Sequence, residues 1–317
     1  MHIEQDDEFW RAATTLPAKR SLYSRDSLFL EGYYDTSVIW QHQLSSILPR
    51  VALVLFKSET IAGGRLEGAH ELLSAQGFAA VAAELVRFTG GMFHDLWRYQ
   101  FQRATADKIR LYTRWAAGTD GVVAAYIRTM RHPRRPASVD MKVFKGPAAV
   151  NCRKPEQLRS LMGSPNSILN FVHASDEPAD VLRELAVLIP ADCRDRVLHA
   201  IAVSDLEAGQ RELLALVRKF ASKPPHDLNV TKAGERLAAV CRAAGAGNPR
   251  YFDAVMTREK PLVLRDMERA VRTRRAEIDP IDVIVFASEY VRRDLPLPGD
   301  LDDDCVPGWD AVDRDLG

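Results

Sequence analysis

Short unbroken runs of apolar residues alternate with helically spaced ones through the middle of this chain. V-A-L-V-L-F at 51–56 and G-V-V-A-A-Y-I-R at 121–128 are rich in β-branched residues, which predicts buried strands. F-A-A-V-A-A-E-L-V-R-F at 78–88 and S-I-L-N-F-V at 167–172 are expected to form two more strands. The four runs together predict one sheet.

Helical spacing fills the segments between these runs. Leu66, Ala69, Leu72 and Leu73 fall on one face of a helix that Gly77 would end. Helices are expected at 63–77, 89–101, 104–116, 154–163 and 177–189. The order β-α-β-α-α-β-α-β-α predicts a mixed α/β domain with helices on one face of the sheet, and a ferredoxin-like split βαβ sheet is one such arrangement.

The two ends of the chain differ from this middle part. Residues 1–49 mix aromatic and charged side chains, a composition that suits an N-terminal extension packed on a neighbouring domain. Residues 191–317 read as mainly helical, and the acidic tail at 300–317 is expected to be loosely ordered. We therefore expect three regions: the extension 1–49, a domain over 50–190 and a helical C-terminal region over 191–317.

Composition and charge exclude several classes of partner. The chain of 317 residues has 43 Lys plus Arg and 43 Asp plus Glu, so it has no overall attraction to nucleic acid or anionic membrane. No apolar run approaches the roughly 20 residues that span a bilayer, and the acidic N-terminus lacks a signal core. A cytoplasmic location is expected. The basic stretch 131–136 is interpreted as a solvated loop rather than a nucleic-acid site.

Cysteine and histidine spacing gives no sign of a metal centre. The four cysteines are far apart and form no C-x-x-C pair. His42, His70, His94 and His199 lack ligand spacing with acids or cysteines. No metal site built from protein ligands alone is therefore expected.

The segment N-F-V-H-A-S-D, residues 170–176, is the strongest candidate for chemistry. His173 comes just after an apolar run and just before a helix, whose N-terminus favours anions. Glu184 lies at the border of the apolar stripe of that helix and would seek a donor. If His173 Nδ1–H donates to Glu184, then Nε2 is left unprotonated and nucleophilic.

Lys57 supplies the second part of this hypothesis. It ends the first apolar run and is followed by Gly63 and Gly64, and a lysine beside glycine-rich backbone can hold a phosphate oxygen. Taken alone, a histidine after a strand is more often structural and such a lysine more often solvated. The functional interpretation depends on the two segments together.

With these segments in view, residues 51–190 resemble the nucleoside diphosphate kinase family. The strand followed by Lys57, the helix ending in Q-G-F, the stretch L-V-R-F-T and the N-x-x-H-x-S-D signature occur in the family's order. A glutamate eleven residues after the histidine completes the pattern. The resemblance implies an α+β fold, with a ferredoxin-like βαββαβ sheet and helices, followed here by a mainly helical C-terminal extension.

The resemblance implies roles for the residues of the signature and the first strand. His173 would accept a phosphoryl group from a nucleoside triphosphate and pass it to a diphosphate. Glu184 would orient the imidazole, and Ser175 would support that contact. Lys57 would bind the phosphates and stabilise charge on the transferred group.

Four further residues match the family pattern by position. Tyr99 matches the tyrosine near the catalytic histidine, and Arg159 a phosphate-binding arginine. Lys142 stands where the family has another arginine, and Asn170 would contact the sugar hydroxyls. The base-stacking aromatic is not identifiable, although Tyr112 is one candidate. The implied cofactor is Mg²⁺ carried by the nucleotide.

Departures from the pattern keep a second hypothesis open. Ser58, Gly63 and Ala148 replace family residues, and Lys142 cannot form the bidentate contact of an arginine. The alternative is a weak or inactive nucleotide-sensing module whose helical extension binds a partner, and a third hypothesis is an assembly scaffold. Nucleoside di- and triphosphates are the expected ligands. Family members form symmetric oligomers, but the extra segments could block a homo-oligomer here.

Overall fold

The computed structural model describes residues 3–129, 134–243, 249–271, 277–295, 299, 301 and 303–312. Its four strands are β1 (Val51–Phe56), β2 (Phe78–Arg87), β3 (Asp120–Arg128) and β4 (Val172–Ala174). The helices up to β4 are α1 (Asp7–Ala13), α2 (Pro17–Tyr23), α3 (Ser27–Trp40), α4 (Leu44–Ile47), α5 (Ser58–Ala62), α6 (Leu66–Ala75), α7 (Gly90–Leu96), α8 (Ala106–Arg110), α9 (Ala137–Lys145) and α10 (Leu158–Leu161).

Further α-helices follow β4, and several short helical turns lie between the elements. The α-helices after β4 are α11 (Pro178–Leu188), α12 (Ala191–Val203), α13 (Leu206–Ala221), α14 (Val230–Ala243), α15 (Arg250–Met256), α16 (Leu264–Ala270), α17 (Pro280–Tyr290) and α18 (Val306–Ala311). The short turns are η1 (Ile3–Gln5), η2 (Gln41–Gln43), η3 (Leu48–Arg50), η4 (Gln100–Gln102), the π-helix η5 (Leu111–Ala116) and η6 (Val150–Cys152).

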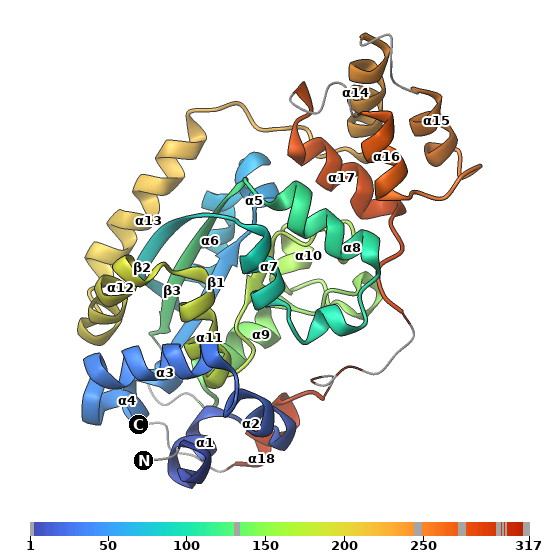
Figure 1. The fold of residues 1–317 in the computed structure, drawn as a ribbon. Helices are drawn as coiled ribbons and strands as arrows, with labels where there is room; N and C mark the ends of the chain where they lie inside the picture. The colour runs from blue at the N-terminus through green and yellow to red at the C-terminus, as the bar shows by residue number, and fades with distance from the viewer. Residues whose placement is uncertain are drawn as a thin grey trace.

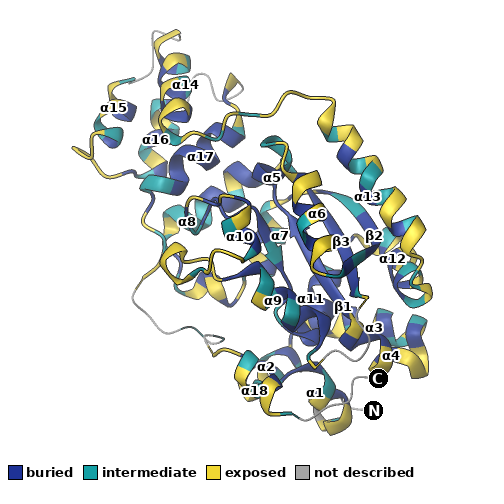
Figure 2. Ribbon diagram, turned by 180° about the vertical axis from the view of Figure 1, so that it is seen from behind, coloured by how far each residue is buried: buried dark blue, intermediate teal, exposed yellow. Residues whose placement is uncertain are grey.

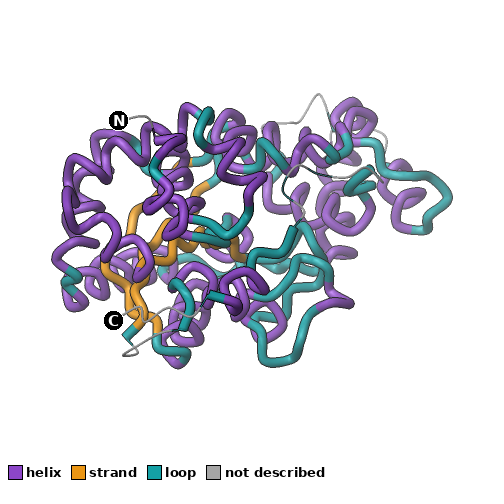
Figure 3. Tube along the Cα trace, turned by 90° about the horizontal axis from the view of Figure 1, so that it is seen from below, coloured by secondary structure: helices purple, strands orange, loops and turns teal. Residues whose placement is uncertain are grey.

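The strands form one sheet with the order β2-β3-β1-β4, in which every neighbouring pair is antiparallel. All six residues of β1 are buried because the strand is central and helices cover both faces. Figure 3 shows the strands in the interior, with helices above and below them. The expectation of a mixed α/β sheet domain is confirmed in this general form, whereas the expectation of helices on only one face was wrong, because α11 covers the second face.

Helix α11 covers one face of the sheet, whereas α6 and α9 cover the other (Figures 1 and 2). The N-terminal helix α3 packs on the outer side of α11. A side-chain carbon on Gly32 would lie only 1.9 Å from the carbonyl oxygen of Leu182, so only glycine permits this close approach. The first forty residues are thus built onto the helix that follows β4.

Helix α13 covers the exposed edge of the sheet at β2 (Figure 1). Gly209 faces the backbone of Val81, where a side-chain carbon would approach to 2.4 Å. Glu212 accepts a hydrogen bond from the backbone N–H of Ala83 at 3.2 Å. An edge strand covered in this way cannot pair with a strand of another chain.

Helices α14–α17 form a separate group beside α8 and η5 (Figure 1). Contacts that tie this group to the sheet domain include an ion pair between Arg110 and Glu268 and a hydrogen bond from Leu264 N–H to Asp107 Oδ1. Within the described part of the chain, no helix is long and apolar enough to cross a membrane.

The acidic tail is more ordered than its composition predicted. Helix α18 lies against the N-terminal helices, with Cys305 and Trp309 both buried. The indole N–H of Trp309 donates to Glu177 Oε1 at 2.7 Å. The expectation of a loose tail was wrong for 303–312, because two buried side chains among the acids anchor this segment.

Two local predictions also differ from the structure. The strand expected at 167–172 begins only at Val172, because Asn166 Oδ1 accepts from the N–H groups of Ile168 and Leu169 and so turns the backbone. Helix α9 was not predicted; it begins after Pro136, which presets the backbone angle. Of the basic loop 131–136, residues 131–133 lie outside the described part, whereas Arg135 pairs with Asp140 and Asp310.

Candidate functional site

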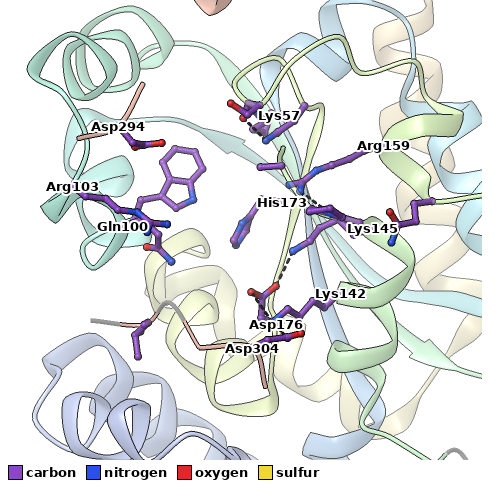
Figure 4. A pocket seen from close by; sticks show the side chains of 18 of the residues that line it. Lys57, Gln100, Arg103, Lys142, Lys145, Arg159, His173, Asp176, Asp294 and Asp304 are labelled. Carbon is purple, nitrogen blue, oxygen red and sulfur yellow. Dashed lines mark hydrogen bonds and ion pairs between the residues drawn. The ribbon is translucent and has the colours of Figure 1, made fainter. Parts of the chain in front are cut away.

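A cavity of about 730 Å³ opens beside β4, between α7–α8 on one side and α9–α10 on the other. Basic and aromatic side chains line it, and Figure 4 labels several of the basic ones. Those used below are Lys57, Trp97, Lys142, Lys145, Arg159 and His173. The structure therefore brings together the histidine and the three cations that the sequence analysis had singled out, and adds a fourth cation.

His173 lies within β4 and pairs with Leu55 of the central strand, so its backbone is held by the sheet. Its side chain is 19% exposed, and its Nε2 atom lies 2.8 Å from Glu184 Oε1. Ser175 donates a hydrogen bond to the other oxygen, Glu184 Oε2, at 2.7 Å. Because each carboxylate oxygen has a donor, Glu184 is fixed in one orientation and fixes the ring in turn.

The two ring nitrogens have the opposite arrangement to the one expected. A carboxylate only accepts, so Nε2 carries the proton and Nδ1 keeps its lone pair. Among the described residues, Nδ1 has no hydrogen-bond partner. The ring of Trp97 stands edge-on to the imidazole, with 6.2 Å between centroids. The nitrogen able to attack is therefore Nδ1, and the prediction of Nε2 was wrong.

Lys57 follows β1 directly and is 4% exposed. Its ammonium lies 2.6 Å from Glu59 Oε1 and donates to the carbonyl oxygen of Ile168 at 2.8 Å. Burial lowers the pKa of Lys57, and the attraction of Glu59 only partly opposes this. A lysine has three donors, so one N–H remains after these two contacts.

Arg159 is a buried cation with no carboxylate partner among the described residues. Its Nη1 donates to Gly146 O and its Nη2 to Val172 O, both at 2.7 Å, while its Nε–H has no partner. Burial lowers its pKa to about 10, which still leaves the guanidinium charged at neutral pH. A charge buried without a counterion is costly, and an anionic ligand in the cavity would offset that cost.

Lys145 is the cation that sequence reasoning missed. From α9 its ammonium donates to the carbonyl oxygen of Ala174 and to Asp176 Oδ1, both at 2.9 Å. Burial lowers its pKa, with Asp176 opposing. Met141 and Lys145 are buried one turn apart in α9, so recognising that helix would have marked Lys145 as inward-facing.

Lys142, in the same helix, is less buried and is held by acids. Its ammonium lies 3.0 Å from Asp304 Oδ1 and 3.7 Å from Asp176 Oδ2. It also donates to the sulfur of Cys305 at 3.3 Å. It lines the cavity, as expected of a phosphate-binding group, but no arginine-like bidentate contact is available to it.

The remaining residues of the sequence analysis divide between the cavity and its surroundings. Asn170 lines the cavity and donates to Ser167 O at 2.8 Å. Tyr112 also lines it, and the ammonium of Lys57 lies 6.0 Å from the centre of its ring. Tyr99 instead donates to Asp26 Oδ2 at 2.8 Å and lines a pocket of about 50 Å³ that shares His173 with the large cavity.

No group of three or more His, Cys, Asp or Glu side chains in the described part of the chain is placed to hold a metal ion. The carboxylates that line the cavity include Asp176 and Asp304, and each of these is paired with a lysine. A divalent cation in this cavity would need oxygen ligands from a bound molecule.

Comparison with known proteins gives structural likenesses alone. No protein-family model matches the chain, and no curated protein matches it either. A nucleoside diphosphate kinase from Aquifex aeolicus is 18% identical, covers 44% of this chain and 93% of its own, and has a TM-score of 0.37. One from Borrelia burgdorferi with bound vanadate and ADP is 14% identical over 45% and 88%, with a TM-score of 0.37.

A third solved structure, the NDP kinase from Pyrobaculum aerophilum, is 15% identical, covers 45% of this chain and 97% of its own, and has a TM-score of 0.35. TM-scores below 0.5 carry no argument about what this chain does. Its function has to be argued from its own residues.

Proposed function

We propose that this chain is a nucleoside diphosphate kinase-like phosphotransferase with His173 as its phosphate carrier. The observation that carries the proposal is the geometry of that ring. Among the described residues, Nε2 is held by Glu184, Nδ1 has no hydrogen-bond partner, and the ring lines a cavity that also contains Arg159, a buried cation without a carboxylate partner. An imidazole positioned beside a buried cation that has no carboxylate partner among the described residues suits a phosphohistidine intermediate.

The proposed reaction has two balanced halves. Nδ1 attacks the terminal phosphorus of a nucleoside triphosphate, a P–N bond forms, and the bond to the bridging oxygen breaks to release the diphosphate. An oxygen of an acceptor diphosphate then attacks the same phosphorus and the P–N bond breaks. Throughout, Glu184 accepts a hydrogen bond from Nε2–H and stabilises the positive charge that the ring acquires.

The cations divide the remaining work. Arg159 and Lys57 line the cavity, where they supply positive charge to the phosphate oxygens. Lys145 positions the turn after His173 by holding Ala174 O and Asp176. When Mg²⁺ is bound to the phosphates it neutralises part of their charge. The residues fit that mode of delivery, because the described part of the cavity wall supplies cations for the phosphates and no acid cluster placed to hold a metal ion.

An aromatic wall gives the nucleotide base a place to bind. Trp97, Phe101 and Tyr112 line the cavity and their rings pack against one another, with 4.5 Å between the centroids of Trp97 and Tyr112. Flat apolar rings stack on any base, so this wall favours a nucleotide over a simple phosphate without choosing the base. We propose Asn170 for the sugar hydroxyls, and a supporting role for Tyr99 through Asp26.

The arrangement of the sheet supports the same proposal and constrains assembly. The all-antiparallel order β2-β3-β1-β4, with α6 and α9 on one face, is that of a ferredoxin-like split βαβ sheet. Because α13 covers β2, a homo-oligomer of this chain would have to form through another surface.

The test is transfer of label. The protein is incubated with γ-labelled ATP and Mg²⁺, and an acid-labile, alkali-stable label is expected in the wild type and not in His173→Gln. Addition of unlabelled GDP should move the label to GTP. A protein that binds ATP but never becomes labelled is the nucleotide-sensing module of the alternative hypothesis, and the phosphotransferase proposal then fails.

A further inference from the structure

The described end of the chain, residues 303–312, contributes acids to a cavity built for anions. We call this segment the C-terminal arm. Asp303, Asp304 and Val306 line the cavity, and α18 follows directly. Figure 4 shows Asp304 beside Lys142 and Asp176, on the same side of the cavity as His173.

The rest of the cavity wall is strongly basic. Among its described residues are six basic side chains, not counting His173, and only two acids outside the arm, Asp176 and Asp294. The basic side chains are Lys57, Arg103, Lys108, Lys142, Lys145 and Arg159. The arm thus doubles the number of carboxylates, in a place where a polyphosphate would have to compete with them.

One contact makes this competition direct. Asp304 Oδ1 lies 3.0 Å from the ammonium of Lys142, which also lies 3.7 Å from Asp176. Burial opposes the charge of Lys142, but these two carboxylates outweigh it and raise its pKa. Lys142 is therefore a stable cation whose nearest carboxylate partner belongs to the arm, and a phosphate that bound it would take the place of Asp304.

The arm is docked rather than resting loosely on the cavity. Trp309 donates to Glu177 Oε1 at 2.7 Å, and the backbone carbonyl of Cys305 accepts from Thr15 Oγ1 at 3.2 Å. Glu177 is fully buried and also holds Lys19 at 2.7 Å. It stands four residues after His173, so the arm is anchored to the segment that carries the candidate nucleophile.

We propose that the C-terminal arm is a built-in acidic competitor, in which Asp304 occupies Lys142 until a polyphosphate displaces it. The inference rests on the proposed function in that it takes the phosphates of a nucleotide as the ligand. The arm would lower the affinity of the site for polyphosphates and so set the concentration at which the site fills.

The experiment measures binding of inorganic tripolyphosphate to the full chain by calorimetry at low ionic strength. Asp304→Asn should bind about two- to fivefold more tightly than the wild type, the range expected for one solvent-exposed ion pair. Asp310→Asn is the matched control, because it removes the same charge from the same arm but pairs with Arg135, away from the cavity. It should leave the affinity unchanged.

A second pair of variants tests the route of the effect. In a Lys142→Met background, Asp304→Asn should leave the affinity for tripolyphosphate unchanged, because the ammonium for which Asp304 and the phosphate compete is gone. The proposal is overturned if Asp304→Asn binds no more tightly than the wild type, if Asp310→Asn strengthens binding equally, or if the effect persists without Lys142.

The two proposals can fail separately. Tripolyphosphate binding needs no phosphoryl transfer. If Asp304→Asn binds more tightly but the protein is never labelled by ATP, the proposal about the arm holds and only the proposed phosphotransferase function is overturned. If His173 is labelled but Asp304→Asn does not change the affinity, only the proposal about the arm is overturned. Absence of tripolyphosphate binding in every variant overturns the arm as well.

Discussion

Two clusters of buried charged side chains are built around helix α11, and they differ in what they leave unpaired. In the first, Arg183 donates through Nε to Asp26 Oδ2 at 3.0 Å and through Nη2 to Asp95 O at 2.5 Å. Asp180 of the same helix accepts from Lys19 and Tyr23. Every charge in this cluster has a partner of opposite sign, and the cluster joins the N-terminal helices to α11.

The second cluster begins one turn further along the helix, at Glu184, and stays open. His173 Nδ1 and Arg159 Nε–H have no partner among the described residues, although both belong to side chains lining the cavity. The pKa values of the lysines differ between the two clusters in the same way. Burial opposes the charge of Lys19, but Asp180 and Glu177 outweigh it and raise its pKa. Burial prevails for Lys57 and Lys145, and their pKa values are lowered.

This contrast distinguishes a cluster that stabilises the fold from a cluster that could bind a ligand. Buried polar groups in a folded protein are nearly always satisfied, so unsatisfied groups beside a cavity are candidates for contact with a ligand or with water. The first cluster should therefore control stability and the second should control binding. Matched substitutions of one arginine in each cluster test that division.

Removal of Arg183 should have the largest effect. Arg183→Gln leaves Asp26 buried without its main counterion, which should cost about 3–5 kcal/mol of unfolding free energy. Urea denaturation measures this loss. The protein that remains folded should bind tripolyphosphate as the wild type does. A loss below about 1 kcal/mol, the range of an exposed pair, would contradict the structural role.

Removal of Arg159 should reverse the pattern. Arg159→Gln leaves no carboxylate unpaired, so the stability loss should be the smaller of the two. Affinity for tripolyphosphate should fall about 10- to 100-fold, as expected for loss of hydrogen bonds to a charged group. Equal affinities for Arg159→Gln and the wild type would show that the open cluster is not an anion site.

A smaller effect should appear in the pH dependence of binding. Phosphate favours the charged forms of Lys57, Lys145 and Arg159, and burial holds the pKa of each lysine below the usual 10.5 and that of Arg159 at about 10. Binding therefore takes up protons as these groups deprotonate, and the affinity should decline as the pH rises toward 10.5, before exposed lysines lose their charge. Titrations from pH 7 upward test this, with Lys145→Met showing a flatter profile. If the affinity does not change up to pH 10.5, the proposed role of both lysines is contradicted.

The strands and the helix that position the site could be predicted because their signals are local. β1 and β3 are apolar runs that pair over their length, and α11 begins at Pro178 with an apolar stripe. The contact between His173 and Glu184 could be predicted from the position of Glu184 at the border of the apolar stripe of α11, together with the resemblance to the kinase family. The choice of ring nitrogen could not, because it depends on how β4 is paired with β1 and on the position of α11.

The features that were missed depend on contacts between distant segments. Lys145 reaches the cavity only because α9 packs against β4, and Tyr99 is bound by Asp26 from the N-terminal extension. The arm is ordered because Trp309 meets Glu177, 132 residues earlier in the chain. Composition alone predicts a solvated acidic tail, since it contains no information about that partner.

The central claim is that Nδ1 of His173 carries the phosphoryl group while Nε2 stays bonded to Glu184. The most direct measurement is NMR of the protein after incubation with ATP and Mg²⁺, which distinguishes phosphate on the two ring nitrogens. The account predicts a single phosphohistidine, at residue 173 and on Nδ1. Phosphate on Nε2, on another residue, or nowhere in a protein that binds ATP would contradict it.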